Sequence, residues 1–358
     1  MAGEWARRAI ALLAADQASE APTPLLRFPL PGDWPFALFV KDESAHPTGS
    51  VKHRFARDLL VDALAAGRIG PDTPLVDATG GNMAVAEAYF ARRLGLPFTA
   101  VVPLKTSPAK RARIEEHGGV CLPVDPPLAV YDRARELAER TRGHYLDHLA
   151  NLGHAVDARA ADDSHGLAGE VLRDLADAGQ PPPAWIVLGV GTGASSRAVG
   201  RHLRGHGLGT RVAVVDPENS AYFPGWVTDC GDYATGMPSR IEGIGRPRVE
   251  PAFDGSAVDL VIPVPDAASV AAMRYLDRVV GLRGGPSTGA CLQGAFHILH
   301  RMRSDGVEGA VVMVAGDSGA PYADTYYDDG WVSERSWDLA GPTAELERFL
   351  RTGSRAPW

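Results

Sequence analysis

Lysine is scarce in this chain. Only four of its 36 basic residues are lysines, at positions 41, 52, 105 and 110, and the other 32 are arginines. The abundance of arginine beside alanine, glycine and proline is typical of a GC-rich genome, because the codons of these residues are GC-rich. The scarcity is useful, since any chemistry that depends on a lysine amine has only four candidate residues.

Two further absences exclude classes of protein. The formal net charge is −8, whereas nucleic-acid-binding proteins usually carry a basic excess or stripe, so no nucleic-acid partner is expected. No run of about 18 apolar residues is present, so no membrane span is expected either. The short apolar stretch 9–15 follows Arg7 and Arg8, and it predicts an amphipathic helix rather than a signal peptide.

Disulfide and metal sites are not expected. The three cysteines are odd in number and far apart, which provides neither a disulfide framework nor a zinc spacing. His144 and His148, like His297 and His300, are spaced for one helix face, but neither pair has a clear third ligand. We therefore expect a protein of the reducing cytoplasm that holds no metal.

Apolar runs alternate with helical patterns along the 358 residues, a length that suggests two domains. Several strands, such as 310–314, are continuous apolar runs, which are typical of buried parallel sheets. We predict an α/β fold of two domains, each an open, mostly parallel sheet flanked by helices. The expected division is a smaller, mobile domain over 37–155, a larger domain over 1–36 and 156–340, and a C-terminal helix and tail over 341–358. The predicted strands are 36–40, 74–77, 98–103, 120–124, 184–188, 211–215, 260–264 and 310–314, and the predicted helices are 52–66, 82–94, 108–117, 128–141, 195–204, 267–280 and 289–303.

A glycine-rich loop over 189–195 follows one predicted strand and opens a helix. Glycines let backbone amides approach an anion, and a helix N-terminus favours negative charge, so the loop is a candidate phosphate cradle. A tight structural turn is the plain alternative. A second alternative is a dinucleotide site, because Gly189, Gly191 and Ala194 match a loose fingerprint and Asp216 follows the next strand.

Lys52 stands at the predicted start of a long helix, after the segment 47–51. The positive end of the helix dipole lowers the pKa of an amine and favours its neutral form. A neutral amine is what Schiff-base chemistry requires. The alternative is a surface lysine, for which a helix N-terminus is an unfavourable position.

Two more helix starts carry polar side chains. Asn82 follows a strand and the turn 79–81, and its amide can both donate to and accept from a ligand oxygen. Ser287 and Thr288 precede Gly289, and one of these hydroxyls could bond a ring nitrogen. In each case the alternative is a side chain that caps its own helix.

Taken in order, these four segments resemble the fold-type II pyridoxal-phosphate enzymes of the cysteine synthase-like family. That family has the patterns Pro-x-Gly-Ser-x-Lys, Thr-Ser-Gly-Asn-Thr, Gly-Thr-Gly-Gly-Thr and a hydroxyl pair before a glycine. The resemblance covers about residues 20–330, and each motif alone is weak, whereas the ordered set is specific. The stretches 215–220, 240–250 and 322–325 are similar to the mycobacterial-type L-cysteine desulfhydrase subgroup.

The resemblance implies a role for each segment. Lys52 forms a Schiff base with pyridoxal 5′-phosphate and later moves the substrate α-proton, and Asn82 bonds the 3′-oxygen of the cofactor. Ser287, or else Thr288, bonds the pyridine nitrogen, and a neutral hydroxyl there suits β-elimination. The family also places the cofactor in the cleft between the two domains. The residues implied for the 5′-phosphate are Gly191, Thr192, Gly193, Ala194 and Ser195.

The substrate loop departs from the family pattern. Members bind the substrate carboxylate with the Thr-Ser-Gly-Asn-Thr loop and a glutamine, but here the serine position is Gly80, the last threonine is Met83 and the glutamine position is His148. Each hydrogen bond to a charged group is worth about 1.5–3 kcal/mol. We therefore expect an altered substrate or binding pose, with Thr79, Gly80, Gly81, Met83 and His148 as the substrate-binding residues.

The implied reaction is β-elimination on an L-amino acid through an aminoacrylate, foremost L-cysteine desulfhydration to sulfide, pyruvate and ammonia. β-Replacement, which builds cysteine or a non-standard amino acid from an activated serine, stays open as an alternative. A dinucleotide-dependent oxidoreductase is a distant one, because it gives no reason for Lys52 or for the Ser287 hydroxyl. The family also implies that the protein is a homodimer and that it binds a small amino-acid substrate.

Overall fold

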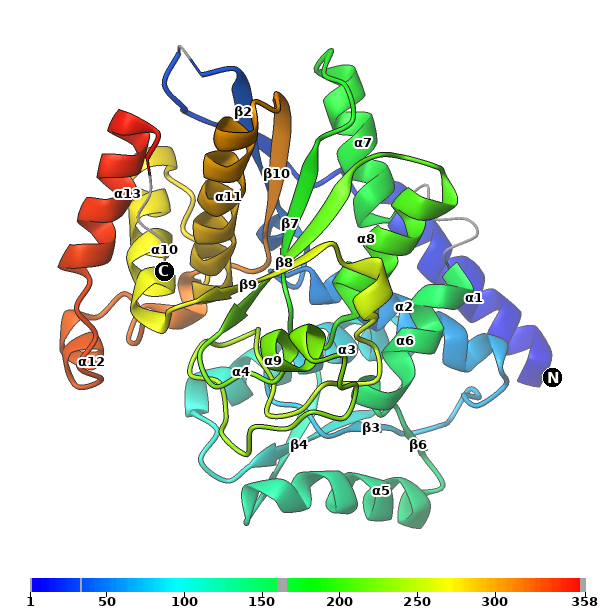
Figure 1. Cartoon of the computed structure of the whole chain (residues 1–358). Helices are drawn as coiled ribbons and strands as arrows, with labels where there is room; N and C mark the ends of the chain where they lie inside the picture. The colour runs from blue at the N-terminus through cyan, green and yellow to red at the C-terminus, as the bar shows by residue number, and fades with distance from the viewer. Residues whose placement is uncertain (1, 33, 160–165, 355–358) are drawn as a thin grey trace. The chain divides into compact units, whose positions relative to one another are not determined.

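The structure, a computed structural model, describes residues 2–32, 34–159 and 166–354. It divides into two compact units, each an α/β unit with its own sheet (Figure 1). Unit 1 comprises Met1–Pro22 and His46–Ala161, and unit 2 comprises Thr23–Ala45 and Asp162–Trp358. Among the described residues, no helix is both long and apolar enough to cross a membrane.

Unit 1 contains a four-stranded, all-parallel sheet in the order β5–β4–β3–β6. Its apolar strand residues Val76 and Val101 pack with Ala134 of α5 in one buried cluster. Helix α4 starts where its sequence indicates, because the Ser107 side chain accepts a hydrogen bond from the backbone amide of Lys110. The strands are β3 (Leu75–Asp77), β4 (Phe98–Pro103), β5 (Val120–Val124) and β6 (His144–Tyr145), and the helices are α1 (Ala2–Ser19), α2 (Lys52–Ala65), α3 (Asn82–Leu94), α4 (Pro108–Glu116), α5 (Val130–Thr141) and α6 (His148–Arg159).

Unit 2 contains a six-stranded sheet in the order β1–β2–β10–β7–β8–β9, parallel except for the edge strand β1. The long helix α11 packs on four of these strands, and its Phe296 lies between Phe28 and Phe349, with ring centroids 5.6 and 4.9 Å away. The strands are β1 (Leu25–Phe28), β2 (Phe36–Asp42), β7 (Trp185–Gly189), β8 (Arg211–Pro217), β9 (Leu260–Val264) and β10 (Gly309–Ala315), and the helices are α7 (Leu167–Asp177), α8 (Ala194–Gly205), α9 (Tyr222–Val227), α10 (Asp266–Val280), α11 (Pro286–Asp305), α12 (Asp329–Ser333) and α13 (Ala340–Thr352).

Lys41, on β2, is completely buried in unit 2. Its ammonium group donates hydrogen bonds to Glu170 Oε1 at 2.7 Å, to Asp174 Oδ2 at 2.6 Å and to the carbonyl oxygen of Thr23 at 2.6 Å. A buried cation is tolerated only when it is paired and hydrogen-bonded in this way. Lys41 therefore has a structural role, tying β2 to α7.

The N-terminal segment belongs to a different unit from the one expected. The sequence predicts that 1–36 belongs to the larger domain, whereas the structure groups 1–22 with unit 1. The reason lies just after α1, where Glu20 bonds His53 at 2.9 Å and pairs with Arg57, both on α2. Burial raises the pKa of Glu20, but the hydrogen bonds from His53 and Arg57 outweigh it and lower that pKa to about 2.

Candidate functional site

Lys52 is the first residue of α2, as predicted. The preceding residue, Val51, offers no side-chain cap, and the Lys52 amide donates to Ser50 Oγ at 3.3 Å. The lysine side chain is half-buried, and its Nζ lies 5.8 Å from the centre of the Phe55 ring. The remainder of α2 is mostly buried, so the lysine is fixed at the start of a firmly packed helix.

The loop after β3 places Asn82 at the start of α3. Gly81, with no side chain, is the cap of this helix, so Asn82 does not cap its own helix. Its Oδ1 instead accepts a hydrogen bond from Arg113 at 3.2 Å. Met83 is buried, and a Cβ atom added at Gly80 would lie 3.2 Å from Val102 Cγ1, which is a tight contact.

His148 begins α6, beside the carboxyl end of β3. Its Nδ1 lies 2.9 Å from Asp77 Oδ2, and its backbone amide also faces that oxygen, at 3.4 Å. The family resemblance implies that His148 binds the substrate, but the sequence does not indicate its carboxylate partner. Asp77 is the last residue of a strand, and nothing in the chain order indicates that it faces residue 148.

In unit 2 the glycine loop joins β7 to α8 as predicted, and its glycines pack tightly against neighbouring backbone atoms. A Cβ atom at Gly191 would lie 2.5 Å from the carbonyl oxygen of Gly243. Gly193 caps α8 with φ of 90°, and a Cβ atom there would lie 2.5 Å from Phe253 Cα. Gly193 provides no side-chain cap for α8, although the Ala194 amide donates to Thr192 Oγ1 at 3.3 Å, and amides at such a helix start suit an anion such as a phosphate.

Ser287 and Thr288 lie in the first turn of α11, whose cap is Gly285. Neither hydroxyl therefore serves as the helix cap. Ser287 Oγ donates to Asp317 Oδ1 at 3.4 Å and lies beside Gly243, where an added Cβ atom would be 3.8 Å from it. Thr288 Oγ1 is buried and has no hydrogen-bond partner within the described part of the chain.

The predicted site residues fall into two sets, one on each unit. Unit 1 carries Lys52, the loop 79–83 and His148, and unit 2 carries the loop 191–195 and the hydroxyl pair of α11. Within unit 2, Ser287 Cβ lies 3.8 Å from the Cβ position of Gly189, at the end of β7, so the hydroxyl and the glycine loop adjoin. Both sets lie where parallel strands end and helices begin, the usual ligand position in α/β folds.

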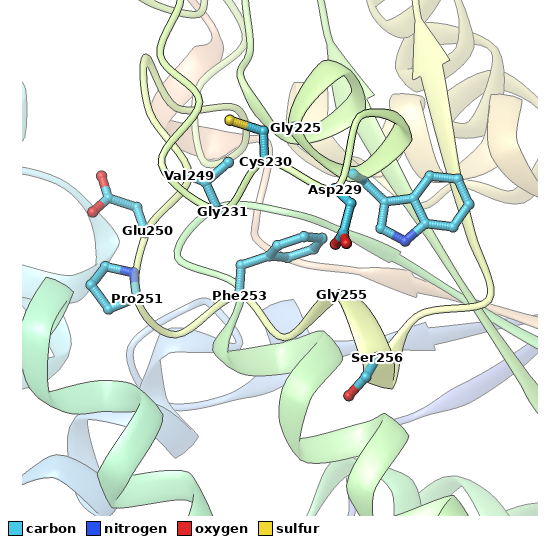
Figure 2. Close-up of a pocket in the computed structure, with 11 residues that line it drawn as sticks. Gly225, Asp229, Cys230, Gly231, Val249, Glu250, Pro251, Phe253, Gly255 and Ser256 are labelled. Atoms are coloured by element: carbon cyan, nitrogen blue, oxygen red, sulfur yellow. The ribbon is translucent and has the colours of Figure 1, made fainter.

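A separate cavity of about 510 Å³ lies in unit 2 (Figure 2). Its wall contains Trp226, Asp229 and Phe253, and none of its lining residues is among those predicted from the sequence. Phe253 also abuts Gly193, so the cavity wall and the glycine loop share one contact.

Comparison with known proteins decides between the alternatives. The family model for pyridoxal-phosphate dependent enzymes matches residues 17–317. The chain belongs to this family. The dinucleotide alternative is therefore wrong. Asp216, the acidic residue that this alternative required, is buried, and its Oδ2 accepts a hydrogen bond from the Phe223 amide. Burial raises the pKa of Asp216 to about 7.

Individual relatives of this pyridoxal-phosphate enzyme cover nearly its whole length. An L-cysteine desulfhydrase of Mycobacterium tuberculosis is 47% identical over 352 residues, 97% of this chain and 95% of the relative. An N-(2-amino-2-carboxyethyl)-L-glutamate synthase of Cupriavidus metallidurans is 30% identical, over 83% of this chain and 84% of its own. The crystal structure of an O-ureido-L-serine synthase matches with a TM-score of 0.73 and 25% identity, over 88% of this chain and 98% of that one.

The residues present fit this cofactor. The glycine loop opens a helix whose cap, Gly193, has no side chain, which suits a phosphate, and a half-buried lysine stands at another helix start. The Ser287 hydroxyl, which could serve a ring nitrogen, adjoins the loop. The Ser287 hydroxyl is held by Asp317, which accepts hydrogen bonds from both Ser287 Oγ and the Tyr322 hydroxyl, the latter at 2.6 Å.

Proposed function

We propose that this enzyme is an L-cysteine desulfhydrase, which removes the β-sulfur of L-cysteine to release sulfide, pyruvate and ammonia. The observation that carries the proposal is the 47% identity to the mycobacterial enzyme of that name across 97% of the chain. The ordered set of lysine, asparagine, glycine loop and hydroxyl supports it, because it is complete in this chain.

Each set of residues has a proposed task. The bound cofactor supplies an electron sink that stabilises negative charge at the substrate Cα. Lys52 holds the cofactor covalently through its amine and then moves the α-proton, and Asn82 orients the ring. The loop 191–195 binds the phosphate, and Ser287, whose side chain adjoins that loop, bonds the ring nitrogen. Loop 79–83 and His148 receive the substrate carboxylate.

β-Replacement on an activated serine is the second candidate. Relatives at 30% and 28% identity carry synthase names, among them an O-ureido-L-serine synthase of Streptomyces lavendulae. Both reactions share removal of the α-proton and loss of the β-substituent, and they differ in whether a second nucleophile then adds.

The test supplies purified holoenzyme separately with L-cysteine, O-acetylserine and O-phosphoserine. We expect L-cysteine to change the cofactor absorbance. We also expect sulfide and pyruvate to be released from it in equal amounts. Rapid consumption of an activated serine only when sulfide or another nucleophile is added would favour replacement. A cofactor band that responds to none of the three compounds would refute both candidates.

The departures at Gly80 and Met83 are expected to set substrate preference. The double variant Gly80→Ser, Met83→Thr restores two hydroxyl donors. We expect it to change the ratio of the kcat/KM values for L-cysteine and O-acetylserine by about tenfold, which is the free-energy equivalent of one hydrogen bond to a charged group. Because the added Cβ atom meets Val102 closely, Val102→Ala is combined with it to relieve the contact. An unchanged ratio, with normal cofactor content and melting temperature, contradicts this prediction.

We also propose a cytoplasmic homodimer. All three cysteines are free thiols, which is consistent with a reducing compartment, and the dimer is inferred from the family resemblance. Sedimentation of the purified enzyme measures the mass, and a monomer at micromolar concentration would contradict the dimer.

A further inference from the structure

Three ionisable side chains meet in the interior of unit 1. Asp77 ends β3, Glu87 lies on α3, and His148 begins α6. Their ligand atoms all lie within 4.8 Å of one another, and both carboxyl groups are fully buried. The cluster is joined to loop 79–83 through the chain, since Asp77 is two residues before Thr79.

The two carboxyl groups require a proton between them. Neither oxygen of Glu87 has a donor among the described residues, and two facing carboxylates in a buried site repel each other. Burial and the Asp77 charge both raise the pKa of Glu87 well above its usual range. The Glu87 carboxyl is then a neutral acid that donates to Asp77 and satisfies both groups.

Asp77 keeps its charge because it is surrounded by donors. Burial raises the pKa of Asp77, but His148, the hydrogen bond with Glu87 and the Ala78 amide, 2.7 Å from Asp77 Oδ1, have the larger effect. The pKa of Asp77 is therefore lowered. The other titratable groups near Asp77 are His144, Tyr145 and Asp147. With a carboxylate at 2.9 Å, Nδ1 of His148 carries a proton.

The second ring nitrogen of His148, Nε2, is able to bind a ligand. Nε2 has no hydrogen-bond partner in the described ranges, and the side chain is 10% exposed. With the proton on Nδ1, a neutral ring has only an acceptor at Nε2, whereas the charged ring has a donor there. While Nδ1 keeps its proton, therefore, only the charged ring can donate from Nε2 to a carboxylate, and it adds the attraction of opposite charges.

We propose that Asp77 and a protonated Glu87 hold His148 as an imidazolium, whose Nε2–H binds the substrate carboxylate in place of the hydroxyls absent at Gly80 and Met83. The inference rests on the proposed function, in which this loop receives an amino-acid carboxylate. Asp77 and Glu87 are positioning residues, because they act through His148. The cluster as a whole is neutral, which makes a buried cation tolerable.

The first readout is the charge of His148, which requires neither substrate nor turnover. In protein labelled with 15N-histidine, the His148 signals are assigned by their loss in His148→Gln. We expect both ring nitrogens to be protonated in the wild type and in Glu87→Gln, whose amide still donates to Asp77. In Glu87→Leu, Asp77 loses a donor, so the proton moves from Nδ1 to Asp77 and the ring becomes neutral.

The second readout is the binding of L-alanine to the holoenzyme, followed by the cofactor spectrum. L-Alanine has the carboxylate but no β leaving group, so its Kd is measurable even if L-cysteine is not the substrate. We expect Kd to rise about tenfold in Glu87→Leu and in Asp77→Asn, with Glu87→Gln within about twofold of the wild type. Asp77→Asn provides the test if Glu87→Leu does not fold.

Three results would each overturn the proposal. The first is a neutral His148 ring in the wild type, and the second is a Kd for L-alanine that does not change in Asp77→Asn. The third is a stoichiometric metal ion in the purified protein that is lost in Glu87→Gln, because one histidine and two carboxylates are also a metal ligand set. Absence of L-cysteine turnover alone refutes the proposed function and leaves this inference standing.

Discussion

Replacing Lys52 by alanine is expected to reduce sulfide release from L-cysteine by about 10³-fold or more. The variant loses both the covalent attachment of the cofactor and the group that moves the α-proton, and proton transfer alone contributes about 10²–10⁴-fold. The cofactor, held only by non-covalent contacts, should also be removed by dialysis. Sulfide release and the absorbance retained after dialysis are the two measurements.

The matched controls separate charge from chemistry. Lys52→Arg keeps a cation at the start of α2 but cannot form a Schiff base, so we expect it to be as inactive as alanine. Lys105→Ala removes an exposed lysine and should leave both measurements unchanged. An active Lys52→Arg variant would contradict the role of Lys52.

Replacing Gly193 by alanine is expected to weaken cofactor binding most among the loop positions. The new Cβ atom would lie 2.5 Å from Phe253 Cα and 2.6 Å from its backbone nitrogen, at a residue with φ of 90°. The left-handed conformation costs about 1–2 kcal/mol and overpacking about 1–3 kcal/mol more. Because the loop must move to relieve this contact, we expect cofactor Kd to rise about 10²-fold and the melting temperature to fall.

Gly205→Ala tests whether any alanine in this helix has such an effect. Gly205 is the last residue of α8, has no atom within 4 Å of its Cβ position, and lies outside the left-handed region. We expect unchanged cofactor affinity and unchanged or slightly raised stability. Equal losses in both variants would show that the effect is on the helix and not on the loop.

The sequence predicts elements best where apolar runs are continuous. β4, β5, β9 and α3 have the predicted bounds, because their ends coincide with glycine, proline or polar residues. β6 was missed, since two residues carry no periodic signal, and its existence depends on pairing with β3. β1 was missed because it is a short antiparallel edge strand that pairs with β2 across a turn.

Residues of the candidate site, like the strands, are predictable only where the local sequence carries a signal. The positions of Lys52, Asn82 and the loop 191–195 at helix starts were predicted, because strand–turn–helix order is readable in the sequence. Glu87 was not found, since a single acid inside an apolar helix has no local signal, and only the packing of α3 against the sheet brings it to Asp77. The unit that contains 1–22 was also not predictable, because it depends on Glu20 reaching residues on α2.

The burial of Lys41 has a practical consequence for handling the protein. This amine is enclosed by two carboxylates, and Lys52 is the residue proposed to hold the cofactor, so amine-reactive reagents are left with Lys105, which is exposed, and Lys110, which is half-buried. Both belong to one segment, at the end of β4 and in the first turn of α4. A fluorophore or a surface support coupled through lysine amines would therefore attach at one face of unit 1, in a nearly uniform orientation and without engineered residues.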